Sequence, residues 1–420
     1  MPALRFKLHP PVRARLAEAV LVLATATTGA SAQPRILPLG TLFPGYETTA
    51  RAVSADGRVV VGTSTAADMQ VHAFRWTSEE GMVDLGLFPG VASTQAYAVS
   101  GNGSVVAGGS VAPNGLGPGL LWTHAAGLTP FSMAGHIAPV ALDISRDGRI
   151  VAGRMLQPNQ LYRGFVMTLG QPPQELPSLP GGYASYAQAM TPDGRFVVGS
   201  ASSSAGTRMV RWELGGPQLD LGITPGATST HANSISADGN TVIGTASMPG
   251  NVTYAILWTS QGGLQDLGPL SDFSTIQLRA LSGDGALAGG YAASGSLSRR
   301  AIIWRTDFGL SDANAYFADR RVNLAGWHLE RINDMTPDGR TFVGQAAQGA
   351  FILYLGGTCG TPDFDNDGRS GTDADIVAFF ACLGGNCCAP CGSADFDDDG
   401  DTGTDMDIEA FFRVLGGGAC

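Results

Sequence analysis

Seven copies of one short pattern constrain the fold of this 420-residue chain more than any other feature. Each copy reads Ser or Thr, any residue, Asp or Asn, Gly, and a second Gly five residues later, with apolar residues on both sides. An Asp-Gly or Asn-Gly pair between apolar runs favours a tight turn, because glycine adopts the positive φ that such a turn requires. The sequence therefore predicts seven β-hairpins. Their turns contain Asp56, Asn102, Asp147, Asp193, Asp238, Asp284 and Asp338, at intervals of 46, 45, 46, 45, 46 and 54 residues.

Two more strands are expected after each hairpin. In the first copy the third strand is predicted at residues 72–76 and the fourth around residues 84–86. The Trp of the third strand recurs as Trp76, Trp122, Trp212, Trp258 and Trp304, with Met167 at the same place in the third copy. Four strands in about 45 residues make one β-propeller blade. We therefore predict an all-β domain over residues 33–357, a seven-bladed β-propeller of four-stranded blades, with the Trp rings packed between blades.

The two ends of the repeat region favour a closed ring. The last repeat has a third strand at residues 350–354 and no fourth strand, whereas residues 36–40 form an isolated strand pattern near the N-terminus. Pairing of that N-terminal strand with the last repeat would leave no long exposed strand edge. The alternative is an open solenoid, which would carry atypical capping repeats at both ends.

The turn motif itself predicts structure and not catalysis. Its Ser or Thr hydroxyl and its Asp carboxylate can hydrogen-bond the local backbone. Seven near-identical copies cannot all form one active site. The pattern is similar to the Asp-box of sialidase-like propellers, but that motif ends in an aromatic residue that these copies lack.

The first repeat resembles a known family. Residues 72–74 read His-Ala-Phe, and they are followed by Gly-Met-Val-Asp-Leu-Gly at residues 81–86 and by Pro-Gly at residues 89–90. This order resembles the HAF repeat of probable extracellular proteins, and the resemblance extends over roughly residues 36–355. The His-Ala-Phe triplet is intact in one copy only. The resemblance implies an extracellular location and leaves activity open, because the family is largely uncharacterised.

The N-terminus has the features of an export signal. A basic leader precedes an apolar run at residues 19–26, and residues 30–32 read Ala-Ser-Ala, the form of a cleavage site. We predict a signal peptide at residues 1–32, with an N-terminal amphipathic helix as the alternative. No later stretch is apolar for long enough to cross a bilayer. We therefore expect a secreted or cell-surface protein without a transmembrane segment in the mature chain.

The acidic charge is concentrated at the C-terminus. From Cys359 onward the chain has thirteen acidic residues and two arginines, a net charge of -11, which equals the net charge of the whole chain. Nucleic acid is not an expected partner, because no basic patch is present to neutralise phosphates. The same segment holds all six cysteines, which predicts disulfides formed outside the cytoplasm. They are Cys359, Cys382, Cys387, Cys388, Cys391 and Cys420.

The acidic segment contains two copies of a loop pattern, 32 residues apart. In each copy carboxylates at positions 1, 3 and 5 precede a Gly at position 6, an arrangement that surrounds calcium with oxygen ligands. Position 7 contributes its backbone carbonyl. We therefore predict a module at residues 358–420 that binds two calcium ions. The ligands expected at these positions are Asp363, Asp365, Asp367 and Arg369 in the first loop, and Asp395, Asp397, Asp399 and Asp401 in the second.

The loop pattern leaves the closing carboxylate open. Position 12, where an EF-hand or dockerin loop has its last carboxylate, holds Ala374 or Met406. We favour a loop one residue longer, closed at position 13. The remaining candidate ligands are Asp373 and Asp405 at position 11, and Asp375 and Asp407 at position 13.

A helix is expected after each loop. Thr372 and Thr404 are the predicted N-caps, each with an Asp three residues later as in a capping box. Each helix carries an apolar stripe, and we expect the two stripes to pack face to face. The stripes are Ile376, Phe379, Phe380 and Leu383 on the first helix, and Ile408, Phe411, Phe412 and Leu415 on the second.

The duplicated loop-helix unit resembles dockerin type I-like modules, in particular those of exported proteins from planctomycete-type bacteria. The resemblance covers Cys359 to Cys420 and implies a paired EF-hand arrangement and a cohesin-like docking partner. The cysteines follow the same 32-residue shift. This symmetry favours three bridges among many possible connectivities, with a redox pair or a zinc site as alternatives. The favoured bridges are Cys359–Cys388, Cys391–Cys420 and Cys382–Cys387.

Three functions remain open from the sequence. The one we favour is a secreted or cell-surface, non-catalytic protein whose propeller binds an extracellular protein or a glycan and whose tail binds calcium. The second is an extracellular polysaccharide hydrolase or lyase, and the third is a structural component of the envelope or matrix. An enzyme should interrupt the repeat with unique residues near strand ends. The residues outside the repeat, each of which we interpret as a loop residue, are His136, Glu175, Tyr183, Tyr186 and His231.

Overall fold

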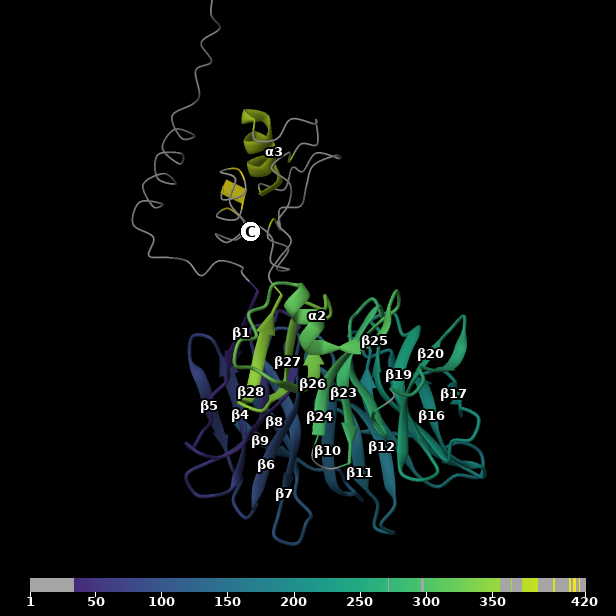
Figure 1. The fold of residues 1–420 in the computed structure, drawn as a ribbon. Coiled ribbons are helices and arrows are strands. Elements are labelled where there is room, and N and C mark those ends of the chain that lie inside the picture. The colour runs from purple at the N-terminus through teal and green to yellow at the C-terminus, as the bar shows by residue number, and fades with distance from the viewer. Residues whose placement is uncertain are drawn as a thin grey trace, which may run out of the picture. The chain divides into compact units, whose positions relative to one another are not determined.

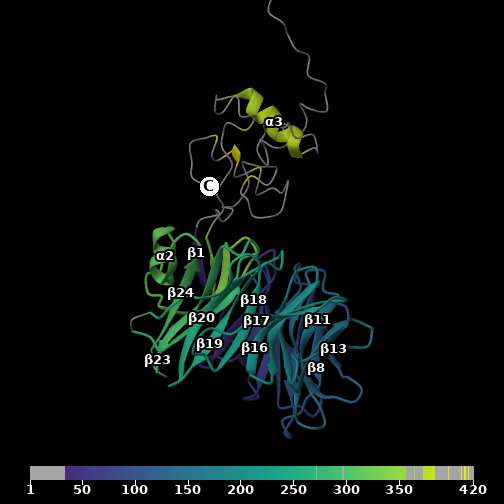
Figure 2. The ribbon, with the colours of Figure 1, turned by 90° about the vertical axis from the view of Figure 1, so that its right-hand side faces the viewer.

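The computed structural model describes residues 34–270, 272–295 and 298–355, then residues 372–383 and the positions 364, 396, 408, 411, 412 and 415. The chain divides into two compact units, one holding residues 34–355 and the other the described residues from 364 onward. Figures 1 and 2 show them from two directions. The predicted signal peptide at residues 1–32 lies outside the described residues.

Residues 34–355 form a mostly β structure, as the repeat pattern predicted. From the N-terminus to the third repeat the strands are β1 (Arg35–Pro38), β2 (Thr48–Val53), β3 (Val60–Thr65), β4 (Val71–Thr77), β5 (Gly81–Gly86), β6 (Ser93–Val99), β7 (Val105–Val111), β8 (Gly119–Thr123), β9 (Gly127–Phe131), β10 (Ile137–Ile144), β11 (Ile150–Leu156), β12 (Tyr162–Thr168) and β13 (Gln174–Leu176). In the later repeats they are β14 (Ser185–Met190), β15 (Phe196–Ser203), β16 (Gly206–Glu213), β17 (Gln218–Gly222), β18 (Ser229–Ile235), β19 (Thr241–Met248), β20 (Val252–Thr259), β21 (Gly263–Asp266), β22 (Thr275–Leu281), β23 (Leu287–Ser294), β24 (Ser298–Arg305), β25 (Gly309–Asp312), β26 (Leu329–Met335), β27 (Thr341–Ala346) and β28 (Gly349–Tyr354).

Consecutive strands pair antiparallel within each repeat, so that β2 pairs with β3, β3 with β4, and β4 with β5. Some repeats are also linked by a single parallel residue pair, such as Val71 with Ser93 between β4 and β6. The last repeat supplies β26 to β28, and β1 completes its sheet by pairing with β28. Figure 1 shows β1 and β28 beside each other. The predicted pairing of the N-terminal strand with the last repeat is therefore confirmed.

The repeated turn is held by its own side chains, as predicted. In the third copy Ser145 Oγ accepts a hydrogen bond from the Ile150 amide at 2.9 Å and donates to Asp147 Oδ1 at 2.6 Å. Asp147 Oδ1 also accepts from the Arg149 amide at 3.0 Å. The hydrogen bond from the backbone amide to the Ser or Thr hydroxyl oxygen recurs in all seven copies. These bonds satisfy backbone donors that the tight turn would otherwise leave unpaired.

The turn glycine also packs against the preceding repeat. Gly103 has a φ of 70°, and a Cβ at this position would lie 2.3 Å from Val59 Cγ2 of the first repeat. The same relation joins each later repeat to the one before it, through Gly148, Gly194, Gly239, Gly285 and Gly339. It also joins the first repeat to the last, because a Cβ at Gly57 would meet Thr341 Oγ1 at 2.9 Å.

Neighbouring turns are connected through the main chain as well. The Gly101 amide donates to the Arg146 carbonyl at 2.9 Å, and the Arg146 amide donates to the Pro192 carbonyl at 2.8 Å. Two further bonds of this kind run from Ala237 to Gly283 at 2.8 Å and from Gly283 to Pro337 at 2.7 Å. Pro192 and Pro337 accept in this series but have no N–H to donate.

The recurrent Trp residues pack between repeats, as predicted. Trp212 of the fourth repeat is 3% exposed and lies in one apolar cluster with Leu176 and Leu179 from the end of the third. Its indole N–H donates to the Pro177 carbonyl at 3.1 Å. Trp76 of the first repeat shares a cluster with residues of the last repeat. Burial of a large aromatic ring between sheets contributes much of the inter-repeat apolar contact.

The long interval before the last turn contains a helix that the strand pattern did not predict. α2 (Ala313–Asp319) begins after Asp312, whose side chain accepts from the Asn314 amide at 2.7 Å. Phe317 is fully buried, and its ring lies 4.9 Å from that of Phe342. α2 therefore packs into the core of the last repeat. No helix among the described residues is long and apolar enough to cross a membrane.

The C-terminal unit contains α3 (Asp373–Leu383). Thr372 precedes it, and its amide and hydroxyl donate to Asp375 Oδ2 at 2.7 and 2.9 Å, so the capping box predicted at this helix is confirmed. The apolar positions of the two predicted stripes meet in one cluster, where the rings of Phe379 and Phe411 stack at 4.1 Å. Phe380 lies at its edge, 37% exposed and 6.1 Å from Phe412.

The contact between the turn glycine and the preceding repeat can be tested with a matched pair of substitutions. Gly103 and Gly115 both have a positive φ, but a Cβ at Gly115 would meet nothing within 4 Å. We expect Gly115→Ala to lower the free energy of unfolding by about 1–2 kcal/mol through backbone strain alone. Gly103→Ala should lower it by about 1–3 kcal/mol more, because the methyl group overpacks against Val59. Urea denaturation measures both, and equal losses would contradict the inter-repeat contact.

Candidate functional site

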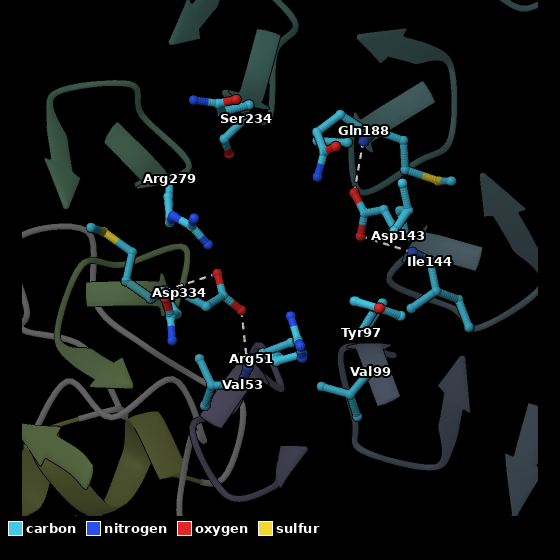
Figure 3. A pocket seen from close by; sticks show the side chains of 18 of the residues that line it. Arg51, Val53, Tyr97, Val99, Asp143, Ile144, Gln188, Ser234, Arg279 and Asp334 are labelled. Atoms are coloured by element: carbon cyan, nitrogen blue, oxygen red, sulfur yellow. Dashed lines mark hydrogen bonds between the residues drawn. The ribbon is translucent and has the colours of Figure 1, made fainter. Parts of the chain in front are cut away.

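A cavity of about 530 Å³ lies between the first strands of the repeats. Residues from all seven repeats line it, and in Figure 3 their side chains point into it from different sides. Its volume falls in the range of small-ligand sites, roughly 300–1,000 Å³. The cavity is therefore a candidate binding site.

The residues that face this cavity share one structural position. Each first strand (β2, β6, β10, β14, β18, β22 and β26) has a β-bulge that leaves one residue unpaired. That unpaired residue lines the cavity in every repeat. In chain order the seven bulge residues are Arg51, Tyr97, Leu142, Gln188, Asn233, Arg279 and Asn333.

Three arginines give one side of the cavity a positive charge. Arg51 and Arg279 are bulge residues, and Arg331 lies two residues before the bulge of the last repeat. None of the three forms a salt bridge within the part of the chain that the structure describes. The pKa of Arg331 is lowered by burial and then by repulsion from neighbouring guanidinium groups, among them Arg279 and Arg51. Burial also lowers the pKa of Arg51.

Two of these arginines lie against aromatic rings. The guanidinium carbon of Arg51 is 4.7 Å from the centre of the Tyr97 ring, and that of Arg279 is 5.4 Å from the centre of the Tyr291 ring. A cation–π contact of this kind stabilises a guanidinium group and restricts its position. The Nε atoms of Arg51 and Arg331 are buried and have no hydrogen-bond partner.

Two bulge asparagines bridge neighbouring repeats. Asn233 Nδ2 donates to the Leu278 carbonyl at 2.7 Å, and Asn333 Nδ2 donates to the Ala50 carbonyl at 2.7 Å. The second bond joins the last repeat to the first. The Oδ1 atom of Asn333 is buried without a hydrogen-bond partner. One bulge position therefore combines an inter-repeat contact with an unsatisfied acceptor.

Two aspartates follow the bulges of the third and last repeats, where the other repeats have Ala or Ser. Asp143 accepts from the Ile144 amide at 2.8 Å and from the Met190 amide of the next repeat at 2.7 Å. Asp334 accepts from the Met335 amide and, in the first repeat, from the Val53 amide, both at 2.9 Å. Each carboxyl group therefore ties two inner strands together (Figure 3).

The surroundings of these two carboxyl groups disfavour their charged form. Burial raises the pKa of Asp143 to about 6, and the hydrogen bonds from Met190 and Ile144 lower it only in part. Burial, with a smaller contribution from repulsion by the Asp143 carboxylate, raises the pKa of Asp334 to about 7 against the lowering effect of the Val53 and Met335 amides. The two groups lie far apart in the sequence yet interact across the cavity (Figure 3).

Of the residues that we placed outside the repeat, two lie in loops as expected and three lie on strands. The loop residues are His136 and Tyr183, and the strand residues are Glu175, Tyr186 and His231. Glu175 is on β13, where it pairs with Arg163 at 3.5 Å and with His136 at 2.9 Å. Its place on the strand matches that of Asp220, which pairs with Arg208 at 3.1 Å in the next repeat. The interpretation of Glu175 as a loop residue outside the repeat is therefore wrong, because it belongs to a recurrent cross-strand ion pair.

Tyr186 and His231 are also strand residues, on β14 and β18, so their interpretation as loop residues is wrong. Tyr186 lies 5.3 Å from the Tyr162 ring, and Tyr183, in the preceding loop, is 62% exposed. Burial lowers the pKa of His231. None of these three is among the residues that line the cavity.

Of the twelve predicted calcium ligands, two fall among the described residues. Asp373 begins α3, and Asp375 is fully buried with the Thr372 bonds on its Oδ2. No cluster of three or more potential metal ligands occurs within the described part of the chain. The ligands outside the described residues are Asp363, Asp365, Asp367, Arg369, Asp395, Asp397, Asp399, Asp401, Asp405 and Asp407.

Cys382 is the one cysteine among the described residues; it is 4% exposed and does not carry a free thiol. The other cysteines of the predicted bridges, Cys359, Cys387, Cys388, Cys391 and Cys420, lie outside the described residues. The bridge connectivity stays a prediction.

The cavity residues escaped the sequence interpretation, although a signal for them was present. The bulge residue stands three positions before the Ser or Thr of each turn, and Asp143 and Asp334 stand two positions before it. When the seven copies are aligned on that Ser or Thr, the position three residues before it differs from copy to copy. The position two residues before it is Ala or Ser in five copies and Asp in the other two. The unique carboxylates expected of a functional site therefore lay inside the repeat.

Comparison with known proteins supports the fold and no closer relationship. No protein family and no curated protein matches the sequence. One solved structure with a similar fold is an oligogalacturonate lyase in complex with manganese, with a TM-score of 0.51 at 10% identity over 76% of this chain and 92% of that chain. Another is the oligogalacturonate lyase of Vibrio parahaemolyticus, with a TM-score of 0.50 at 11% identity over 76% of this chain and 93% of that chain. The β-propeller domain of the Trilobed protease from Pyrococcus furiosus gives a TM-score of 0.48 at 8% identity, over 74% of this chain and 95% of that chain.

The fold of residues 34–355 is a β-propeller. At these identities the comparisons show the fold alone, so the resemblances to HAF repeats and dockerin modules, including the planctomycete-type origin, stay predictions.

The two cavity aspartates predict an unusual dependence of stability on pH. Their pKa values are raised in the folded state, from an ordinary value of 3.8 to about 6 and about 7. The folded protein therefore holds more protons than the unfolded chain in this window, and the free energy of unfolding should fall as pH rises from about 4 to 7. Since one pKa unit corresponds to about 1.4 kcal/mol, the change is on the order of a few kcal/mol.

Thermal unfolding of an Asp143→Asn, Asp334→Asn double variant between pH 4 and 7 measures this effect. Removal of both titrating groups should flatten the profile. Asp147→Asn is the matched control, because the Ser145 hydroxyl lowers the pKa of that turn carboxylate and Asn102 fills the same position naturally. A wild-type profile that is already flat over this range would contradict the raised pKa values.

Proposed function

We propose that this chain is an exported, non-catalytic binding protein: a closed, seven-bladed β-propeller of four-stranded blades that takes its ligand into the central cavity, followed by a calcium-binding tail. The observation that carries the proposal is the row of bulge residues. One backbone position presents a different side chain to the same cavity in each repeat, whereas the turn positions that hold the framework are nearly identical.

The blade number and ring closure rest on contacts that repeat cyclically. Three contacts join the last repeat to the first. They are the close approach of Gly57 to Thr341, the hydrogen bond from Asn333 to the Ala50 carbonyl and the hydrogen bond from the Val53 amide to Asp334. The same kinds of contact join consecutive repeats elsewhere in the chain. β1 supplies the fourth strand beside β28, an arrangement that ties the N-terminus of the domain into the last sheet.

Binding is favoured over catalysis by the state of the two cavity carboxyl groups. Both oxygens of Asp143 and both oxygens of Asp334 accept hydrogen bonds from backbone amides. Each oxygen keeps a second lone pair, but the two amides hold each carboxyl group against the strands, whereas a general base or a nucleophile must be directed at the substrate. These carboxyl groups instead stabilise the strands that form the cavity wall. A polysaccharide hydrolase or lyase is the alternative function.

The calcium proposal concerns residues 358–420 and two ions. Each loop contributes three aspartates with the spacing that calcium requires. The capping box at Thr372 and the aromatic cluster around Phe379 support it, because they are the helix features expected after such a loop. Disulfides would add to the stability of a module of this size. We further propose a cohesin-like docking partner for this tail, as its dockerin resemblance implies.

A cavity-filling substitution tests the binding proposal. Gln188 is an exposed bulge residue that faces the cavity, so Gln188→Trp should block ligand entry without disturbing the apolar core. Leu219→Trp on β17 is the matched control, because Leu219 is 42% exposed and does not line the cavity. An array of extracellular glycans and peptides, probed with the mature chain, should lose its positive signals at least about tenfold with Gln188→Trp and keep them with Leu219→Trp. Signals that both variants keep would contradict a cavity site.

A calorimetric titration of the mature chain tests the calcium proposal. We expect two calcium ions to bind, and their binding should raise the unfolding temperature of the tail, because a ligand that binds only the folded state stabilises it. Asp365→Asn together with Asp397→Asn should abolish the calorimetric signal. Absence of calcium uptake by the wild-type protein at millimolar concentrations would show that the acidic loops have another role.

A further inference from the structure

We propose that the arginine side of the cavity binds the carboxylate groups of an acidic oligosaccharide, a chain of uronic-acid sugars. This inference rests on the proposed function, in that it takes the cavity to be the ligand site. It adds the chemical class of the ligand and the residues that recognise it.

The first argument is uncompensated charge. The chain as a whole carries a net charge of -11, yet Arg51, Arg279 and Arg331 stand together in one cavity without a salt bridge among the described residues. Like charges at close range repel, and burial weakens the screening by water. A carboxylate from a ligand would relieve this repulsion.

The aspartates of the cavity do not supply this compensation. The carboxyl oxygens of Asp334 accept from the Val53 and Met335 amides, and those of Asp143 accept from the Met190 and Ile144 amides. Burial raises the pKa of Asp334 to about 7 and that of Asp143 to about 6, so at neutral pH the two groups together carry fewer than two negative charges, against three guanidinium groups. The positive charge of the cavity is therefore left for an external anion.

The second argument is orientation. Arg51 lies over the Tyr97 ring and Arg279 over the Tyr291 ring, so each guanidinium group is held in place by a contact with an aromatic face. A stacked guanidinium keeps its in-plane N–H groups available, and these groups match the two oxygens of a carboxylate. The Nε atoms of Arg51 and Arg331 are buried, so the terminal N–H groups are the ones that a carboxylate in the cavity would contact.

The third argument separates a sugar from an acidic peptide. Gln188, Asn233, Gln277 and Asn333 line the cavity, and amide side chains are suited to hydrogen bonds with sugar hydroxyls. Leu142 is the one aliphatic residue in the bulge row, so the row offers little apolar surface for peptide side chains.

Isothermal titration of the mature chain with three probes tests this inference. The probes are a linear uronic-acid trisaccharide, the same trisaccharide with its carboxylates reduced to hydroxymethyl groups, and triglutamate. We expect the acidic sugar to bind at least about tenfold more tightly than either of the others. Its affinity should fall as salt rises, because charge–charge attraction is screened.

Arg279→Gln is the variant that assigns the site, because Arg279 is exposed to the cavity and its loss leaves the core intact. We expect it to weaken binding of the acidic sugar at least about tenfold without lowering the unfolding temperature. Arg208→Gln is the matched control, since Arg208 pairs with Asp220 and does not line the cavity.

The outcomes separate this inference from the proposed function. Three results would overturn the ligand class: equal binding of the acidic and reduced sugars, tighter binding of triglutamate, or no effect of Arg279→Gln. If Gln188→Trp still blocks binding in that case, the cavity remains the ligand site. If Arg279→Gln and Gln188→Trp both bind the acidic sugar as tightly as the wild-type protein, the ligand class and the cavity as the site would both be wrong.

Discussion

The hydrogen bonds inside the repeated turn are the interaction on which the rest of the structure depends. Each Ser or Thr hydroxyl accepts from an amide five residues later, and each Asp or Asn oxygen accepts from an amide two residues later. A turn held in this way places its glycine against the preceding repeat, where a side chain would not fit. The turn thus fixes the hairpin and also sets how closely consecutive sheets approach.

The repeated turns fix the backbone of each repeat but leave the side chains that line the cavity free to differ between repeats. Because the turn fixes the end of each first strand, the bulge that precedes it recurs at the same place in every repeat. The unpaired bulge residue faces the cavity and makes little contribution to the core, so its identity is not constrained by packing. Arg51, Tyr97 and Asn333 occupy equivalent positions with different chemistry. Asp143 and Asp334 are the exceptions in the next column, where each replaces a small residue by a clamp between repeats.

Features set by local spacing could be predicted from the sequence. The turn bonds at Ser145, the inter-repeat Trp212 contact, the pairing of β1 with β28 and the capping box at Thr372 all follow from residues near in sequence or from the regular repeat length. The cavity residues could not be predicted in this way. Their role depends on a bulge that shifts the register by one residue, and periodicity does not reveal such a shift. α2 was missed because it belongs to one repeat only.

Titration of the carboxyl carbons of Asp143 and Asp334 by nuclear magnetic resonance tests most directly whether the third and last repeats face one central cavity. A closed arrangement predicts pKa values of about 6 and about 7 for the two groups. It also predicts that Asp143→Asn lowers the pKa of Asp334, because the two carboxylates repel each other across the cavity. A pKa for Asp334 near the ordinary value of about 3.9, unchanged by the substitution at position 143, would contradict the arrangement.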